Sequence, residues 1–207
     1  MTPTIVSFFT PDNDNGYYKH NANRLRAECE ELGLQVWIKK VFFNGRPWEQ
    51  VLKEKPGVIL QALDHVQGPV LWIDVDGSIL HKPKAIEDAL EKNPLIDMMA
   101  VPKVPEKGRP FYMGCVFYNN TEGAREFLAE WREEYNKEDS EELAFGRAYT
   151  RLKGMLVLEP LSKEYMRIDG HDPITKNSVV IHRLSHGDTK REFYKRMADR
   201  TKCREKK

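Results

Sequence analysis

The chain has 207 residues, of which 40% are hydrophobic and 31% are charged, and its formal net charge is +1. This composition is typical of a soluble globular protein. A membrane-spanning helix is not expected, because no apolar run approaches the roughly 18–20 residues that one span needs.

The N-terminus and the cysteines indicate where the protein resides. The first ten residues, MTPTIVSFFT, lack a basic start and a small-residue cleavage site, and therefore indicate a first strand rather than a signal peptide. Cys29, Cys115 and Cys203 are odd in number and far apart, so neither a disulfide framework nor a zinc site follows from them. We therefore expect the protein in the reducing cytoplasm.

Strand and helix patterns alternate along the chain. The predicted elements begin with a strand at 5–9, a helix at 17–32, a strand at 34–38, a helix at 48–63 interrupted at Pro56-Gly57, a strand at 70–73, a helix at 85–90 and a strand at 96–101. A loop containing Pro102, Pro105 and Pro110 follows, and then a strand at 113–118, helices at 123–135 and 140–152, and strands at 155–158 and 178–182. This alternation predicts a single Rossmann-like α/β domain over residues 1–191, with a mostly parallel sheet covered by helices on both faces.

Two aspartates follow the apolar strand at 70–73. Asp74 and Asp76 are separated by one residue and are followed by Gly77. Ligands of open α/β sheets bind outside the carboxyl ends of the strands, so both carboxylates are expected at a ligand site. Two acids at that edge are costly unless they hold a positive group, and a divalent cation that carries a phosphate ligand is the usual occupant. An aspartate followed by glycine is also common in turns, so Asp76 also fits a purely structural role in a turn.

Several stretches carry a resemblance to a known family when they are taken in chain order. They are Thr10-Pro11-Asp12 with Tyr18, Lys55-Pro56-Gly57, the Asp74-Val75-Asp76 motif, Met113-Gly114-Cys115, Glu141-Glu142, and Val180-Ile181-His182 with Gly187 and Lys190. Over residues 4–191 the chain resembles a nucleotide-diphospho-sugar transferase, a glycosyltransferase of the GT-A type with an Asp-x-Asp motif. Two departures stand out: the gap from His182 to Gly187 is longer than expected and contains His186, and Gly77 stands where a larger residue is common.

The resemblance implies a metal-dependent transfer of sugar from a nucleotide-diphosphate sugar, most often a UDP-sugar, to a hydroxyl acceptor. Asp76 is the expected direct metal ligand, while Asp74 binds the metal through water or reaches the ribose. His182 is expected to supply the third ligand, with His186 as the alternative, although a lone histidine after apolar residues is more often an ordinary core or surface residue. Oxygen ligands suit Mg²⁺ or Mn²⁺, and an imidazole in the set is better tolerated by Mn²⁺.

Further residues receive roles from the same resemblance. Thr10, Asp12 and Tyr18 are expected beside the base and ribose, Gly114 beside the donor and acceptor, and Lys190 at the phosphates; Glu141 or Glu142 is expected to orient the acceptor hydroxyl or to act as a base. Structural alternatives stay open for several of these residues, and Lys190 also fits a solvated charge of the tail. The spacing of Tyr18 also fits core packing, Gly114 also fits a bulge, and two acids that open a helix also favour its dipole.

The C-terminal part of the chain is basic. Residues 183–207 contain 10 Lys/Arg and 4 Asp/Glu, whereas the remaining 182 residues contain 23 basic and 28 acidic side chains. A basic end on an acidic body is typical of contact with a polyanion, although a solvated terminal helix fits the pattern as well. Residues 192–207 are therefore expected to form a basic helix or tail that contacts a polyanionic acceptor, such as modified DNA or an anionic glycolipid.

Two other functions use the same residues. The stretch from Asp74 to Ser78 also matches the first motif of haloacid-dehalogenase-like phosphatases, in which the first aspartate attacks phosphorus, and residues 187–192 faintly match a later acidic motif. That first motif normally follows the first strand of the fold, whereas 73 residues precede it here. A non-catalytic nucleotide or nucleic-acid binder that keeps the fold is the second alternative.

Overall fold

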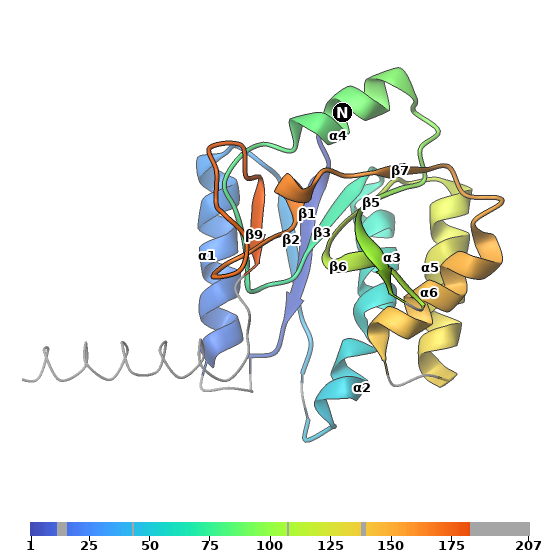
Figure 1. Cartoon of the computed structure of the whole chain (residues 1–207). Helices are drawn as coiled ribbons and strands as arrows, with labels where there is room; N and C mark the ends of the chain where they lie inside the picture. The colour runs from blue at the N-terminus through green and yellow to red at the C-terminus, as the bar shows by residue number, and fades with distance from the viewer. Residues whose placement is uncertain (12–15, 43, 107, 138–139, 183–207) are drawn as a thin grey trace, which may run out of the picture.

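A six-stranded sheet forms the centre of the computed structural model, which describes residues 1–11, 16–42, 44–106, 108–137 and 140–182 (Figure 1). The strand order is β2-β1-β3-β6-β5-β7. The strands are β1 (Thr4–Phe9), β2 (Val36–Lys40), β3 (Val70–Ile73), β5 (Met98–Glu106), β6 (Arg109–Tyr118) and β7 (Leu158–Pro160). Only β6 is antiparallel to its neighbours, β3 and β5, and the other pairs are parallel. The prediction of a mostly parallel sheet is confirmed.

Helices cover both faces of this sheet (Figure 1). They are α1 (Tyr17–Glu31), α2 (Trp48–Leu52), α3 (Lys55–Val66), α4 (Lys84–Lys92), α5 (Glu122–Lys137) and α6 (Glu141–Leu152). One core joins α3, α5 and α6 to Val6 of β1, and a second core joins α1 and α4 to Ile5 of the same strand. Successive strand residues point to opposite faces, so burial on both faces explains the unbroken apolar runs that marked these strands in the sequence.

A small second sheet lies over the α1 side of the central sheet. It has the order β4-β9-β8 and consists of β4 (Gly77–Ile79), β8 (Arg167–Ile168) and β9 (Val180–His182), with a short 3₁₀ helix, η2 (Lys163–Tyr165), before β8. The sequence predicted β9, which contains consecutive apolar residues, but neither β4 nor β8, which contain one isoleucine each and no apolar run. Pairing of β4 with β9 places Gly77 opposite His182.

The prediction of a proline-containing loop after residue 101 is wrong. Strand β5 continues to Glu106 and pairs with β6 in a hairpin that turns at Gly108, where φ is +76°. The register of this pair shifts between Ala100 and Pro102 and again between Pro102 and Glu106. Such irregularities accommodate residues that lack an N–H, and sequence pattern does not reveal them.

Smaller differences concern boundaries. The predicted helix at 48–63 is interrupted at Lys53 and Glu54 rather than at Pro56-Gly57, and Pro56 lies in the first turn of α3, where a missing N–H costs nothing. Strand β2 ends two residues later than predicted, and β7 begins at Leu158 rather than at residue 155. None of the helices among the described residues combines the length and the apolar character that crossing a membrane requires.

The edge strand β7 is connected to the body of the sheet through a buried carboxylate. Oδ2 of Asp97 accepts a hydrogen bond of 2.8 Å from the N–H of Val157, and Oδ1 accepts one from the hydroxyl of Thr121. The N–H of Asp97 donates in turn to the carbonyl of Val157 at 2.8 Å. Asp97 therefore joins the segment before β5, the start of α5 and the segment before β7.

Replacing Asp97 with Ala should lower the free energy of unfolding by about 2 to 4 kcal/mol, because two hydrogen bonds to a buried charged group are lost and Val157 keeps an unpaired N–H. Urea denaturation measures this difference. As a control, Asp64→Ala removes an acid whose side chain is 65% exposed, and should cost less than about 1 kcal/mol. Equal effects of the two substitutions would contradict the role given to Asp97.

Candidate active site

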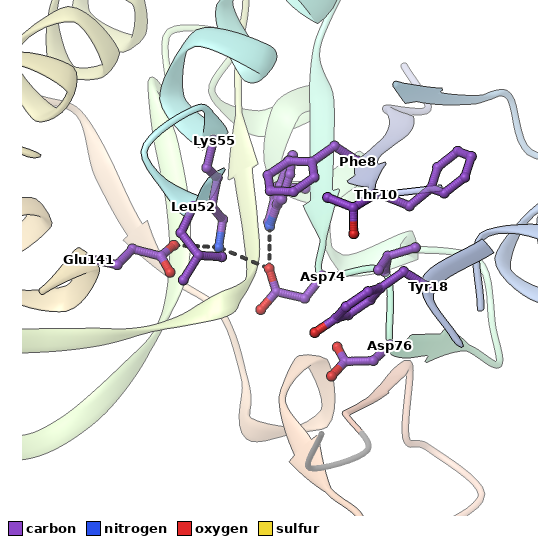
Figure 2. Close-up of a pocket in the computed structure, with 11 residues that line it drawn as sticks. Phe8, Thr10, Tyr18, Leu52, Lys55, Asp74, Asp76 and Glu141 are labelled. Carbon is purple, nitrogen blue, oxygen red and sulfur yellow. Dashed lines mark hydrogen bonds and ion pairs between the residues drawn. The ribbon is translucent and has the colours of Figure 1, made fainter. Parts of the chain in front are cut away.

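A cavity of about 230 Å³ opens at the carboxyl ends of β1 and β3, where ligands of this class of sheet bind (Figure 2). Side chains from the two strands, from α1 and from the starts of α3 and α6 converge on it. The lining residues are Phe8, Phe9, Thr10, Tyr18, Leu52, Lys55, Trp72, Asp74, Val75, Asp76 and Glu141. The lining of the cavity therefore includes most of the predicted site residues that the structure describes.

The turn that carries both aspartates is fixed by hydrogen bonds to its backbone. The N–H of Asp74 donates to the carbonyl of Gly114 at 2.9 Å, and the N–H of Gly77 donates to the carbonyl of Asp74 at 2.7 Å. From α1, Arg24 Nη2 donates to the carbonyls of Asp76 and Gly77 at 3.0 and 2.8 Å. Because the backbone is held from two sides, the two carboxylates project from a defined position.

Asp74, Asp76 and His182 form a cluster with the geometry of a metal site. Each offers one ligand atom, and these three atoms lie within 4.8 Å of one another. His182 is 5% exposed, and its Nε2 has no hydrogen-bond partner among the described residues. Burial lowers the pKa of His182 to about 4, so the imidazole is neutral at pH 7 and retains a lone pair for a cation. Two carboxylates and one imidazole fit Mn²⁺ or Mg²⁺, and a cation there would satisfy the buried nitrogen.

Two glycines make room for the imidazole. A Cβ on Gly114 would lie 2.5 Å from Cε1 and 2.8 Å from Nδ1 of His182, and a Cβ on Gly77 would lie 3.3 Å from the same Cε1. Gly77 is further constrained, because its Cβ would lie 2.9 Å from the carbonyl oxygen of Asp74. The structure thus gives a physical reason for the glycine at position 77, where the resemblance leads one to expect a larger residue. It also assigns the space beside Gly114 to His182.

The ammonium of Lys55 lies in the wall of the cavity between two acids. It contacts Oδ1 of Asp74 at 2.9 Å, Oε1 of Glu141 at 2.6 Å and the carbonyl of Met113 at 3.0 Å. Nε1 of Trp72 donates to the same Asp74 oxygen at 2.8 Å. Figure 2 shows the interactions of Lys55 with Asp74 and Glu141 as dashed lines.

The charges of these groups depend on one another. Burial alone would lower the pKa of Lys55, but the charges of Asp74 and Glu141 outweigh burial and raise this pKa, so the ammonium stays ionised. Desolvation alone would raise the pKa of Asp74, but the charge of Lys55, the nearby His182 and the hydrogen bonds from Lys55 and Trp72 together outweigh desolvation and lower this pKa. Burial raises the pKa of Glu141, and Lys55 offsets only part of that effect. Asp74 is therefore the more strongly ionised partner of Lys55.

The structure places the other predicted site residues as follows. The hydroxyl of Thr10 is fully buried without a hydrogen-bond partner in the described part of the chain, and in Figure 2 it and the phenol of Tyr18 point toward the space beside Asp74 and Asp76. Glu142 is not part of the lining of the cavity, and it pairs instead with Lys103 and, at 3.3 Å, with Arg109. Asp12, His186 and Lys190 lie outside the described residues.

Sequence reasoning gave no role to Lys55, Trp72 or Arg24. Lysine is rarely buried, and nothing near Lys55 in sequence reveals its two acidic partners. Trp72 offered a usable signal, because a buried indole needs an acceptor and Asp74 lies two residues farther along the same strand face. Arg24 and Glu28 show the i, i+4 spacing of an ordinary surface ion pair, which conceals the contact of Arg24 with the turn.

Gly114→Ala should lower the free energy of unfolding by about 1 to 3 kcal/mol, because the new methyl group overlaps the imidazole of His182 and forces it or β6 to move. Gly57→Ala is the matched control. No atom lies within 4 Å of a Cβ on this glycine of α3, so alanine there should stabilise the protein by about 0.5 to 1 kcal/mol. Urea unfolding compares the two variants, and a Gly114→Ala protein as stable as the wild type would refute the packing of His182 against β6.

No protein-family model matches this sequence, and no curated protein matches it. Solved structures do. A glycosyltransferase involved in the glycosylation of the major capsid of PBCV-1 superposes with a TM-score of 0.71 at 15% identity, covering 95% of this chain and 100% of that one. The bifunctional glycosyltransferase WbbM (TM-score 0.59, 11% identity) and the glycosyltransferase GlyE of Streptococcus pneumoniae TIGR4 (0.56, 14%) match 89% and 90% of this chain, but only 46% and 55% of their own lengths. The chain therefore has the fold of these glycosyltransferases, as the resemblance in its sequence implied.

Proposed function

We propose that this protein is a metal-dependent glycosyltransferase that moves a sugar from a nucleotide-diphosphate sugar to a hydroxyl acceptor. We further propose that the donor is a UDP-sugar. The observation that carries the proposal is the convergence of Asp74 and Asp76, which line the cavity, with His182, which lies beside them outside the lining. In a fold shared with glycosyltransferases, such a cluster suits a divalent cation. When bound, this cation would supply Lewis-acid stabilisation of the departing diphosphate.

The remaining residues of the cavity suit the nucleotide and the sugar. Thr10 and Tyr18 lie after β1 and at the start of α1, and their hydroxyl groups are directed toward the two aspartates (Figure 2). A cavity of about 230 Å³ accommodates one part of a nucleotide sugar, with the diphosphate at the open rim beside the aspartates. Asp12 and Lys190 stay predictions for the ribose and the phosphates.

Glu141 is better supported than Glu142 as the acid that orients a hydroxyl group or accepts its proton. Its carboxylate lines the cavity and is held by Lys55, whereas Glu142 pairs with Lys103 and Arg109 outside the cavity lining. The raised pKa of Glu141, which burial causes, brings its basicity closer to the range that general bases use.

The phosphatase alternative finds no support. Its nucleophilic aspartate normally follows the first strand of the fold, whereas Asp74 follows the third strand of this chain. The structural comparisons also lead to glycosyltransferases. A non-catalytic binder of the same fold is distinguished from a transferase by turnover of the sugar nucleotide.

Thermal unfolding with UDP, GDP, CDP or TDP, each with and without Mn²⁺, tests the proposal. One nucleotide should stabilise the wild type by about 2.7 kcal/mol at ~100 times its dissociation constant, and only with the metal. Asp76→Asn should abolish this shift, while Asp64→Asn, on the exposed end of α3, should keep it. A shift that is independent of Mn²⁺, or that survives in Asp76→Asn, would contradict the proposed site.

A polyanionic acceptor is a second part of the proposal and rests on the basic residues 192–207, which lie outside the described part of the chain. Deleting these residues should weaken binding to duplex DNA or to vesicles with an anionic glycolipid. The deletion should also flatten the dependence of affinity on salt between about 50 and 200 mM, because fewer counterions are released. Fluorescence anisotropy and vesicle sedimentation measure the two cases. Unchanged affinity and salt dependence in the truncated protein would contradict a role of the tail in acceptor binding.

A further inference from the structure

Lys55 brings a full positive charge to the proposed metal site without being able to bind a ligand directly. Its side chain is 3% exposed. Its ammonium donates hydrogen bonds to Oδ1 of Asp74 and to the carbonyl of Met113, and it forms an ion pair with Oε1 of Glu141 at 2.6 Å. The ammonium also lies 5.0 Å from the centre of the Trp72 ring. Three protein groups thus surround the buried ammonium, and its influence on a bound ligand is expected to be exerted through its charge.

The carboxylate of Asp74 stands between this charge and the proposed cation. Lys55 and Trp72 both donate to Oδ1 of Asp74, and Figure 2 shows the second oxygen turned away from Lys55. A cation held by that second oxygen would share the carboxylate with the ammonium. Because Lys55 is shielded from solvent, its repulsion of the cation is screened far less than that of a surface lysine.

We propose that Lys55 is a built-in cation that weakens the binding of free metal and strengthens the binding of the nucleotide diphosphate. The inference rests on the proposed function, since it needs a cation between Asp74, Asp76 and His182. The direction of each of these two effects on affinity follows from charge alone. A fixed positive charge near the site repels Mn²⁺ and attracts a diphosphate, so the metal is held weakly until the nucleotide supplies further negative charge and oxygen ligands.

Three other roles for Lys55 predict different results when its charge is removed. If Lys55 only maintained the fold, its loss would weaken metal and nucleotide binding together. If it only oriented Asp74, its loss would weaken metal binding, and if it contacted the nucleotide directly, its loss would weaken nucleotide binding alone. Only a charge effect makes metal binding tighter and nucleotide binding weaker in the same variant.

The test measures Mn²⁺ binding by electron paramagnetic resonance without nucleotide, and UDP binding by calorimetry at saturating Mn²⁺. Lys55→Met should bind Mn²⁺ about tenfold more tightly than the wild type and UDP about tenfold more weakly. Lys55→Gln keeps a polar group at the same place and should show both changes with the same signs, which serves the test if the methionine variant does not fold. Lys92→Met, on the exposed end of α4, should leave both affinities within about threefold.

Trp72→Phe is the matched comparison at the same carboxylate oxygen. It removes a neutral donor from Oδ1 of Asp74, so metal binding should weaken by about three- to tenfold, in the direction opposite to Lys55→Met. Unchanged or weaker Mn²⁺ binding in both neutral Lys55 variants would overturn the inference while leaving the proposed function intact. A wild-type protein that binds no Mn²⁺, alone or with UDP, would overturn the proposed function and this inference with it.

Discussion

The imidazole of His182 reaches the two aspartates because neither Gly77 nor Gly114 carries a Cβ. Strand β9 pairs with β4, which begins directly after the Asp-x-Asp turn, and this pairing sets His182 opposite Gly77. On its other side the ring packs against β6 at Gly114, whose carbonyl also holds the N–H of Asp74. The same two glycines therefore determine where the imidazole of His182 lies and how the first aspartate is anchored. A side chain at either position would separate the three groups.

Two of the buried polar groups that lack a hydrogen-bond partner among the described residues lie in or beside the cavity, and others, such as the hydroxyl of Ser7, lie elsewhere. Nε2 of His182 and the hydroxyl of Thr10 are buried, and neither has a hydrogen-bond partner among the described residues. Buried polar groups are almost always paired, because an unpaired one costs about 1–3 kcal/mol. Such atoms beside a cavity indicate a polar ligand. The proposed cation at the imidazole and the proposed nucleotide at the hydroxyl would satisfy both groups.

Local patterns predicted the part of the site that a single strand carries. Asp74 and Asp76 follow an apolar run, and the rule that ligands bind at the carboxyl ends of strands is sufficient to place them in the cavity. His182 came from the resemblance, since the β4–β9 pairing that brings it to Asp74 joins residues about a hundred positions apart. Lys55 received no role for the same reason, because its partners lie on β3, β6 and α6. The proline-containing strand β5 was mistaken for a loop, because register shifts leave no pattern in a sequence.

A direct test of the central claim is the location of the cation. Crystals of the protein grown with Mn²⁺ and UDP, measured at the manganese absorption edge, show where the metal lies through its anomalous scattering. The account predicts one peak within coordination distance of Asp74 or Asp76 and of His182, with the diphosphate of UDP on its open side. A bound UDP without a peak at these residues, or a peak elsewhere on the molecule, would contradict the account.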